Sequence, residues 1–169
     1  MTAHAAHPSG YAPLVSVPSG RRPPIGGHPT LRRSFVALGT IPLFDGVRSR
    51  HLRRLARETD VARFESGRPI VEEGRSGEAM FVMLSGTAKV VRGGRRVAAL
   101  MPGDFFGELS ALDRGPRSAS VVAETPTEVL RLYRHTLRHL LEEEPAVVFR
   151  MLEGLARRLR QVRPGAPVA

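Results

Sequence analysis

The sequence predicts a mainly β domain: a double-sheet jelly roll with one helix before it and two helices after it. Three observations predict this fold. Between residues 61 and 133, short runs of alternating apolar and polar residues are separated by Gly, Pro or Asp, which is typical of strands and turns. On both sides of this region the apolar residues recur at helical spacing. The length of 169 residues, 41% of them hydrophobic, suffices for one domain plus a tail.

The N-terminal segment has the composition of a disordered chain. Residues 1–30 contain six prolines and four glycines and few large apolar side chains. Burial of so little apolar surface cannot offset the entropy lost on ordering. We therefore expect residues 1–40 to form a disordered arm. The alternative is a docking peptide, for which Leu31–Phe35 offers a basic and apolar patch.

A first helix is expected at about residues 47–58. Val47, Leu52 and Leu55 fall near helical spacing there, opposite a set of arginines. One apolar face of this kind predicts a helix that packs at the edge of the sheets.

The central region predicts seven or eight strands, the number and spacing of a small jelly roll. Gly93 and Gly94 lie between two of the runs and indicate a tight hairpin. The expected strands are Val61–Phe64, Pro69–Glu72, Met80–Leu84, Ala88–Arg92, Arg96–Met101, Ser118–Ala123 and Glu128–Tyr133.

Two helices are expected after the strands, at about residues 134–142 and 145–162. Pro145 suits the first position of the second helix, because its missing N–H is not needed there. The apolar seam of that helix, from Val148 to Val162, covers about two heptads, so we expect it to cover the roll. A monomer or a weak homodimer through 145–162 is consistent with this seam. Gly154 inside the helix indicates close packing or a bend.

The charge is concentrated at the two ends of the chain. The net charge is +10; residues 1–44 contain four arginines and no acidic residue, and five arginines lie between 150 and 163. Basic ends can attract DNA, an anionic membrane or an acidic partner, although charged runs are usually solvated surface. We therefore do not expect a nucleic-acid partner.

Several classes of protein are excluded or disfavoured. The chain has no cysteine, which excludes disulfides and cysteine-bound metal or iron–sulfur sites. It has no apolar run long enough to span a membrane, so we expect a cytoplasmic protein. His135, His139 and Glu142 have a spacing compatible with a metal, but no further ligand set accompanies them, and a solvated helix face is the preferred interpretation. No catalytic motif is visible, and we expect no enzyme; a metal-dependent barrel enzyme is a distant third hypothesis.

Residues 106–121 carry the most informative motif. Gly107 and Ser110 allow a short helical turn to begin near a ligand, and free N–H groups at such a start favour an anion. Arg117 follows a Gly-Pro turn, from which its guanidinium can bind two phosphate oxygens. Glu108 would be repelled by a phosphate in contact with it, but it can accept a hydrogen bond from a neighbouring ribose hydroxyl.

This segment resembles the phosphate-binding cassette of the cyclic nucleotide-binding domains, the family of the catabolite activator protein and the regulatory subunits of protein kinase A. Ile70–Gly86 resembles the strand, turn and glycine signature that precedes the cassette, and Pro102–Gly107 resembles its usual approach. The resemblance implies an eight-stranded β-roll, a cyclic nucleotide-binding domain at residues 41–163 and a short flexible tail at 164–169. It implies a cyclic nucleotide as ligand and no cofactor.

The resemblance also implies roles for individual residues. Glu108 would bind the ribose 2′-hydroxyl, and Arg117 the cyclic phosphate. In activator-like members, hydroxyl residues far along the last helix contact the base, whereas this chain has Gln161 and Arg163 there. The lid over the base is therefore Arg163 or Gln161, by stacking, or a partner, and Arg163 is the expected site residue. Ser118, where a threonine is the other option, favours cyclic AMP over cyclic GMP. The remaining expected site residues are Gly107, Leu109, Ser110 and Ala119.

The expected function is that of a stand-alone cyclic nucleotide sensor. A helix-turn-helix module would need about 60 residues after the last helix, and six follow residue 163. We expect the sensor to relay ligand occupancy to an unidentified protein partner through its C-terminal helix or N-terminal arm. The alternative is a basic module, associated with nucleic acid or a membrane, whose nucleotide pocket is silent.

Overall fold

The computed structural model describes residues 35–36 and 38–161. Most of the predicted N-terminal arm, and the whole of the predicted tail at 164–169, lie outside the described residues. Leu38 is fully buried in the core, so the packed part of the chain begins before residue 41, where we placed the domain boundary.

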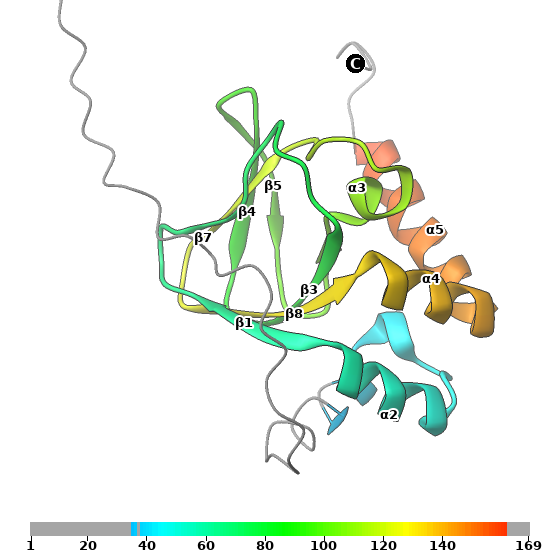
Figure 1. The fold of residues 1–169 in the computed structure, drawn as a ribbon. Coiled ribbons are helices and arrows are strands. Elements are labelled where there is room, and N and C mark those ends of the chain that lie inside the picture. Colours follow the sequence, from blue (N-terminus) through cyan, green and yellow to red (C-terminus); the bar gives the residue numbers. More distant parts are fainter. Residues whose placement is uncertain (1–34, 37, 162–169) are drawn as a thin grey trace, which may run out of the picture.

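Within the described residues, eight strands form two antiparallel sheets of four strands each, which confirms the predicted double-sheet roll (Figure 1). The first sheet has the order β1 (Asp60–Phe64), β8 (Thr127–Tyr133), β3 (Ala79–Ser85) and β6 (Phe105–Phe106). The second sheet has the order β2 (Pro69–Val71), β7 (Ser120–Ala123), β4 (Ala88–Arg92) and β5 (Arg95–Leu100).

The seven predicted strands are all present, and the eighth is β6, which the sequence pattern did not locate. With two residues, β6 is too short to show an alternating pattern. It pairs with β3 through Phe81 and Phe106 and through Val82 and Phe105. The predicted strand at 118 begins only at Ser120, because residues 118 and 119 belong to the bend that precedes β7.

Within the first sheet, β3 is buried on both faces along most of its length. Met80 and Val82 belong to a core cluster shared with the helices, whereas Phe81 and Met83 belong to a second cluster between the two sheets. Alternate residues of one strand point to opposite faces. An uninterrupted apolar strand therefore joins the helical layer to the interior of the roll.

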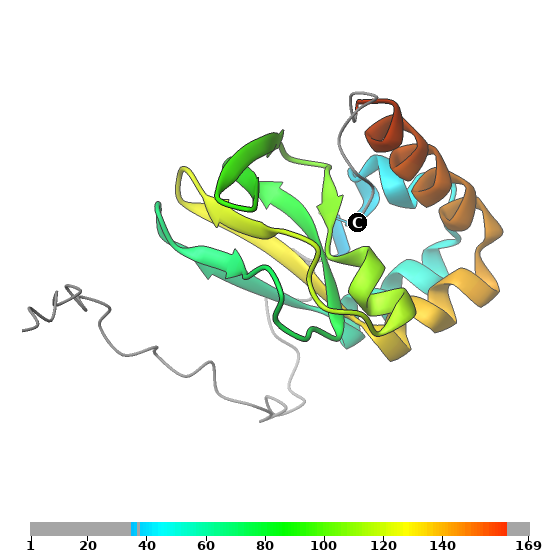
Figure 2. The same cartoon turned by 90° about the horizontal axis from the view of Figure 1, so that it is seen from above.

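The helices gather on one side of the sheets (Figures 1 and 2). They are a short 3₁₀ helix η1 (Pro42–Phe44), α2 (Ser49–Glu58), α3 (Glu108–Asp113), α4 (Arg134–Glu143) and α5 (Pro145–Gln161). The predicted N-terminal helix and both predicted C-terminal helices are confirmed, with small shifts of their ends. None of the described helices is long and apolar enough to cross a membrane.

A buried carboxylate connects α2 to the junction between α4 and α5. Glu144 is 6% exposed, and its Oε1 lies 3.0 Å from Arg48 Nε and 2.5 Å from His51 Nδ1. Burial raises the pKa of Glu144, but the hydrogen bonds from Arg48 and His51 outweigh this effect and the pKa is lowered. This ion pair fixes the point at which α5 leaves α4.

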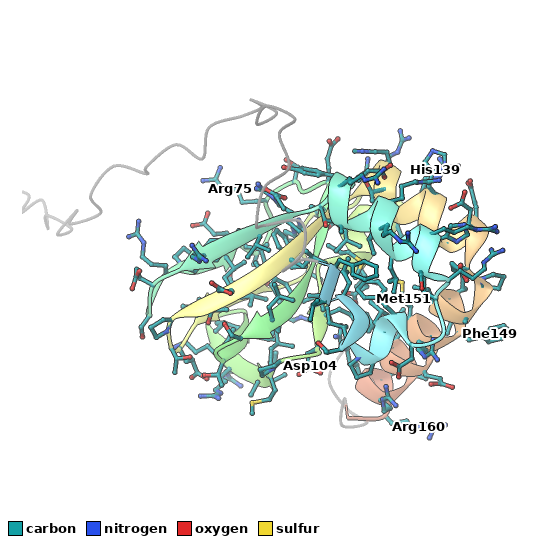
Figure 3. All side chains as sticks on the ribbon, turned by 90° about the horizontal axis from the view of Figure 1, so that it is seen from below. Arg75, Asp104, His139, Phe149, Met151 and Arg160 are labelled. Carbon is teal, nitrogen blue, oxygen red and sulfur yellow. The ribbon has the colours of Figure 1, made fainter. Side chains whose placement is uncertain are left out.

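The face of α5 that covers the roll is not the predicted seam. Val147, Met151 and Gly154 are buried, whereas Leu152 and Leu159 of the seam are 55% and 73% exposed. Figure 3 shows Met151 directed inward and Phe149 at the outer surface. These three buried residues are spaced by four and then three positions, as the residues of the predicted seam are. Each of them lies one position earlier in the chain than the corresponding seam residue. A period-based argument cannot distinguish two adjacent faces of a helix that both carry apolar residues.

Candidate functional site

Gly107 forms the turn between β6 and the short helix α3, as the motif predicted. Its φ of 74° lies in the left-handed region, which favours glycine. A Cβ atom here would lie 2.4 Å from Nη1 of Arg117 and 3.2 Å from the carbonyl oxygen of Ala79. The position therefore requires glycine both for its backbone conformation and for the close approach of Arg117.

Arg117 is a buried cation, 7% exposed, beneath this turn. Its Nη1 donates to the Gly107 carbonyl at 2.8 Å and to Ser110 Oγ at 2.7 Å, and its Nη2 donates to the Ala79 carbonyl at 2.7 Å. Its guanidinium also lies 5.6 Å from the centre of the Phe81 ring. Burial lowers the pKa of Arg117, and the negative charge of Glu108 acts in the opposite direction.

The acceptors around Arg117 are all neutral. In the described part of the chain no carboxylate lies within ion-pair distance of it. A buried charge without a counter-charge is costly, so this environment favours the entry of an anion. Gly77 gives Arg117 the space it occupies, because a Cβ there would lie 2.3 Å from the Arg117 Nε atom.

Glu108 is 3% exposed and is paired with the last helix rather than with Arg117. Nη1 of Arg158, on α5, donates to Glu108 Oε1 at 2.9 Å. Arg158 also donates to the Phe105 carbonyl and lies 4.7 Å above the centre of the Phe105 ring. Glu108 therefore forms its ion pair with Arg158 and not with Arg117.

Gly154 brings α5 close enough for this contact. A Cβ at Gly154 would lie 2.8 Å from Cζ of Phe105. The predicted close packing at Gly154 is confirmed. Because Arg158 is one helical turn beyond Gly154, both residues lie on the face of α5 that meets β6.

The structure brings most of the predicted site residues together. Gly107, Glu108 and Ser110 lie around the turn, and Arg117 connects to two of them by hydrogen bonds. Leu109 is 43% exposed. Ser118 is exposed and its carbonyl accepts from Arg92 Nε at 3.1 Å, Ala119 is 9% exposed, and Arg163 lies outside the described residues.

Sequence reasoning missed Arg158, which we had counted only as part of a basic end. Nothing in the sequence distinguishes it from Arg157 and Arg160; only its position one helical turn after Gly154 relates it to the close packing expected there. Among the described residues, no group of three His, Cys, Asp or Glu side chains is placed to hold a metal ion.

Comparisons with known proteins agree with this geometry. The model of the family "Cyclic nucleotide-binding domain" matches residues 61–144. The cyclic AMP receptor protein of Thermus thermophilus is 42% identical over an alignment of 103 positions, and the match covers 58% of this chain and 48% of that protein. A cAMP-dependent protein kinase regulatory subunit of Aspergillus fumigatus is 37% identical over 113 residues, which are 65% of this chain and 27% of that protein.

A solved structure of the Thermus thermophilus catabolite activator protein has a TM-score of 0.63 and 38% sequence identity. The match covers 71% of this chain and 59% of that one. The chain thus spans about half the length of its bacterial relative and a smaller part of the kinase subunit. Through residues 61–144, which hold the two-sheet roll and the turn around Gly107, the chain belongs to the cyclic nucleotide-binding domain family.

Proposed function

We propose that this domain is a sensor that binds one cyclic nucleotide, cyclic AMP in preference to cyclic GMP, and that it acts by binding rather than by catalysis. The observation that carries the proposal is the charge balance of the site. Arg117 and Arg158 contribute two positive charges and Glu108 one negative charge, so the three residues have a net charge of +1. A cyclic nucleotide carries a single negative charge on its phosphodiester and would bring this site to neutrality.

The cyclic phosphate belongs at Arg117 in this proposal. Arg117 is buried among neutral acceptors, and its planar guanidinium can donate to two phosphate oxygens at once. The hydrogen bonds to Gly107 and Ala79 keep the side chain in place before a ligand arrives. Ser118 and the backbone N–H of Ala119 follow directly in the chain and would complete the phosphate site.

The ribose belongs at Glu108. Its carboxylate has two oxygens, of which Oε1 accepts from Arg158, so the carboxylate has further capacity for a ribose hydroxyl. Arg158 keeps Glu108 paired after the phosphate has neutralised Arg117. Without Arg158, the bound phosphate and Glu108 would be two negative charges in a partly buried site with one cation.

We propose that the contact between Arg158 and Glu108 also relays ligand binding to a partner. Because Arg158 is on α5, a ligand that binds better when Arg158 contacts Glu108 stabilises the docked position of α5. The outer face of α5 exposes Phe149, Leu152 and Leu159, which is the surface we propose for the output, either to a protein partner or to a second copy of the chain. The names of the relatives, a cyclic AMP receptor and a kinase regulatory subunit, support a role of this kind.

Calorimetric titration with cyclic AMP and cyclic GMP tests the proposal. We expect the wild type to bind one nucleotide per chain, with tighter binding of cyclic AMP, and Arg117→Gln to weaken binding by about 100-fold or more. Arg63→Gln is the matched control, since Arg63 pairs with Glu128 at the surface of β1. A wild type that releases no heat at about 1 mM of either nucleotide would exclude the sensor function. Retention on DNA that depends on salt would then favour the alternative, a basic module with a silent pocket.

A further inference from the structure

A second pocket, separate from the candidate nucleotide site, lies where the end of α3 meets the start of α4. Its volume is about 320 Å³, which is within the range of small-molecule sites. None of its lining residues belongs to the site predicted for the nucleotide. They are Glu78, Arg114, Tyr133, Arg134, His135 and Arg138.

The pocket is strongly basic, and its cations are poorly paired. Arg138 lies 3.8 Å from Glu142, and Arg134 lies 3.8 Å from Glu78, whose side chain is 80% exposed. Exposed pairs at such distances contribute little. The Arg114 guanidinium has no hydrogen bond or ion pair within the part of the chain that the structure describes. Two carboxylates, Glu78 and Glu142, thus lie near the three guanidinium groups, both at 3.8 Å and both exposed.

The start of α4 places these charges where helix electrostatics opposes them. Tyr133 is the N-cap residue, its side chain makes no capping hydrogen bond, and the first turn contains no acidic residue. Arg134, His135 and Arg138 instead fall within the first five residues. The positive end of the helix dipole favours anions at this position and disfavours cations. An anion bound among these basic side chains would relieve that repulsion.

Two further features suit a ligand. Arg114 has a φ of 65°, the only positive φ of a non-glycine residue in the described chain, a conformation that costs about 1 kcal/mol or more. The rings of Tyr133 and His135 are parallel within 13°, with centres 6.2 Å apart, and give the pocket an aromatic wall. The strained turn presents an otherwise unpaired guanidinium at the edge of this wall.

We propose that this pocket is a second anion site, and that its ligand is a phosphate-bearing polyanion such as pyrophosphate or the phosphate chain of a nucleotide. Arginine is the residue best matched to phosphate geometry. Three guanidinium groups exceed the charge of one monoanion, and the two nearby carboxylates, Glu78 and Glu142, are too exposed to neutralise them.

The second site is connected to the first. Arg134 donates from Nε to the Ala111 carbonyl at 2.8 Å and from Nη2 to the Ser110 carbonyl at 2.9 Å, both in α3. The Ser110 hydroxyl in turn accepts from Arg117. A polyanion that engages Arg134 therefore acts on the helix that carries the candidate nucleotide site.

Titration of the full chain with inorganic pyrophosphate at low salt tests this site, with ATP as a second probe. We expect saturable binding that Arg114→Gln and Arg138→Gln each weaken by about tenfold, while Arg95→Gln, the same charge change on exposed β5, leaves it unchanged. Both pocket arginines are exposed, and circular dichroism checks that the variants fold. Equal affinities for the two probes would assign the binding to the phosphates alone, and tighter ATP binding would add contacts with the aromatic wall.

Arg117→Gln separates this site from the nucleotide site. We expect it to weaken cyclic AMP binding by about 100-fold or more and to leave pyrophosphate binding intact. Loss of pyrophosphate binding in Arg117→Gln, with no change in Arg114→Gln and Arg138→Gln, would overturn the second site and place the anion at Arg117. The absence of any pyrophosphate binding at about 5 mM would overturn it as well.

Discussion

Arg158 of α5 and Glu108 of α3, fifty residues apart in the chain, form an ion pair of 2.9 Å in which the carboxylate is almost completely buried. The arginine also lies over the Phe105 ring and donates to the Phe105 carbonyl. One side chain therefore connects the last helix to both the turn and the strand that precedes it.

Replacing Arg158 should weaken nucleotide binding. Arg158→Gln removes the charge that keeps Glu108 paired when the phosphate arrives, and we expect an approximately tenfold lower affinity for cyclic AMP. Calorimetry on wild type and variant measures the change. Arg160→Gln, an exposed position on the same helix, is the control and should bind as the wild type does. An affinity that rises in Arg158→Gln would instead mean that Arg158 competes with the nucleotide for Glu108.

Adding one methyl group at Gly154 should loosen α5. Alanine has the higher helix propensity, by about 1 kcal/mol, but its Cβ would lie 2.8 Å from Cζ of Phe105. The ring must move, and the stacked Arg158 must move with it. We expect Gly154→Ala to lower both the melting temperature and the affinity for cyclic AMP. Glu153→Ala on the exposed side of the same turn should change neither, and a stabilised Gly154→Ala would show that α5 does not pack on β6.

The ionised Glu144 carboxylate should make the free energy of unfolding depend on pH in the acidic range. Its pKa in the folded protein lies below the ordinary value of 4.5 because Arg48 and His51 donate to it. The folded state therefore binds fewer protons than the unfolded state in this range, so the stabilisation is fully present above the ordinary pKa and is lost as the pH falls below it.

Urea unfolding of wild type and Glu144→Gln between about pH 3 and pH 7 measures this effect. We expect the wild type to be more stable than Glu144→Gln by about 1 to 3 kcal/mol. This difference in the free energy of unfolding should be constant at the upper end of the pH range and should shrink below pH 4.5. Glu142→Gln, exposed on α4, should show no such difference. A difference that grows as the pH falls would contradict a lowered pKa for Glu144.

Two buried threonines should respond in opposite ways to removal of the hydroxyl. Thr136 Oγ1 is buried and has no hydrogen-bond partner in the described structure, so Thr136→Val should be neutral or stabilising by about 1 kcal/mol. Thr127 Oγ1 lies 2.8 Å from the carbonyl oxygen of Thr125 and 3.2 Å from that of Thr87, so its one hydrogen has an acceptor, and Thr127→Val should cost about 1 to 2 kcal/mol. Thermal unfolding of both variants compares them directly, and an equal loss in both would show that Thr136 has a partner after all.

Local patterns predicted most of the fold. Short apolar or alternating runs between turn residues located seven of the strands, and Gly107 was predictable because a left-handed turn favours glycine. Arg117 was predicted from its place in the motif, and it hydrogen-bonds to the carbonyl of Gly107. Strand β6 was not predictable, since two residues show no period. Its place depends on pairing with β3, which is distant in the sequence.

The part of the site on α5 could not be predicted for a different reason. Arg157, Arg158 and Arg160 are chemically equivalent in the sequence, and only Arg158 reaches Glu108. Which of them does so depends on the face of α5 that is buried, and this face is set by Gly154 and Met151 rather than by the more regular leucine seam. Tertiary packing therefore decides the residue, and helical periodicity alone does not.

The most direct test of the account compares cyclic AMP with 2′-deoxy-cyclic AMP in calorimetric titrations of the wild type and Glu108→Gln. If Glu108 accepts the ribose hydroxyl, the wild type should bind the deoxy ligand about tenfold more weakly, and Glu108→Gln should barely distinguish the two ligands. Equal binding of both ligands by the wild type, or no binding of either, would contradict the assignment of this site.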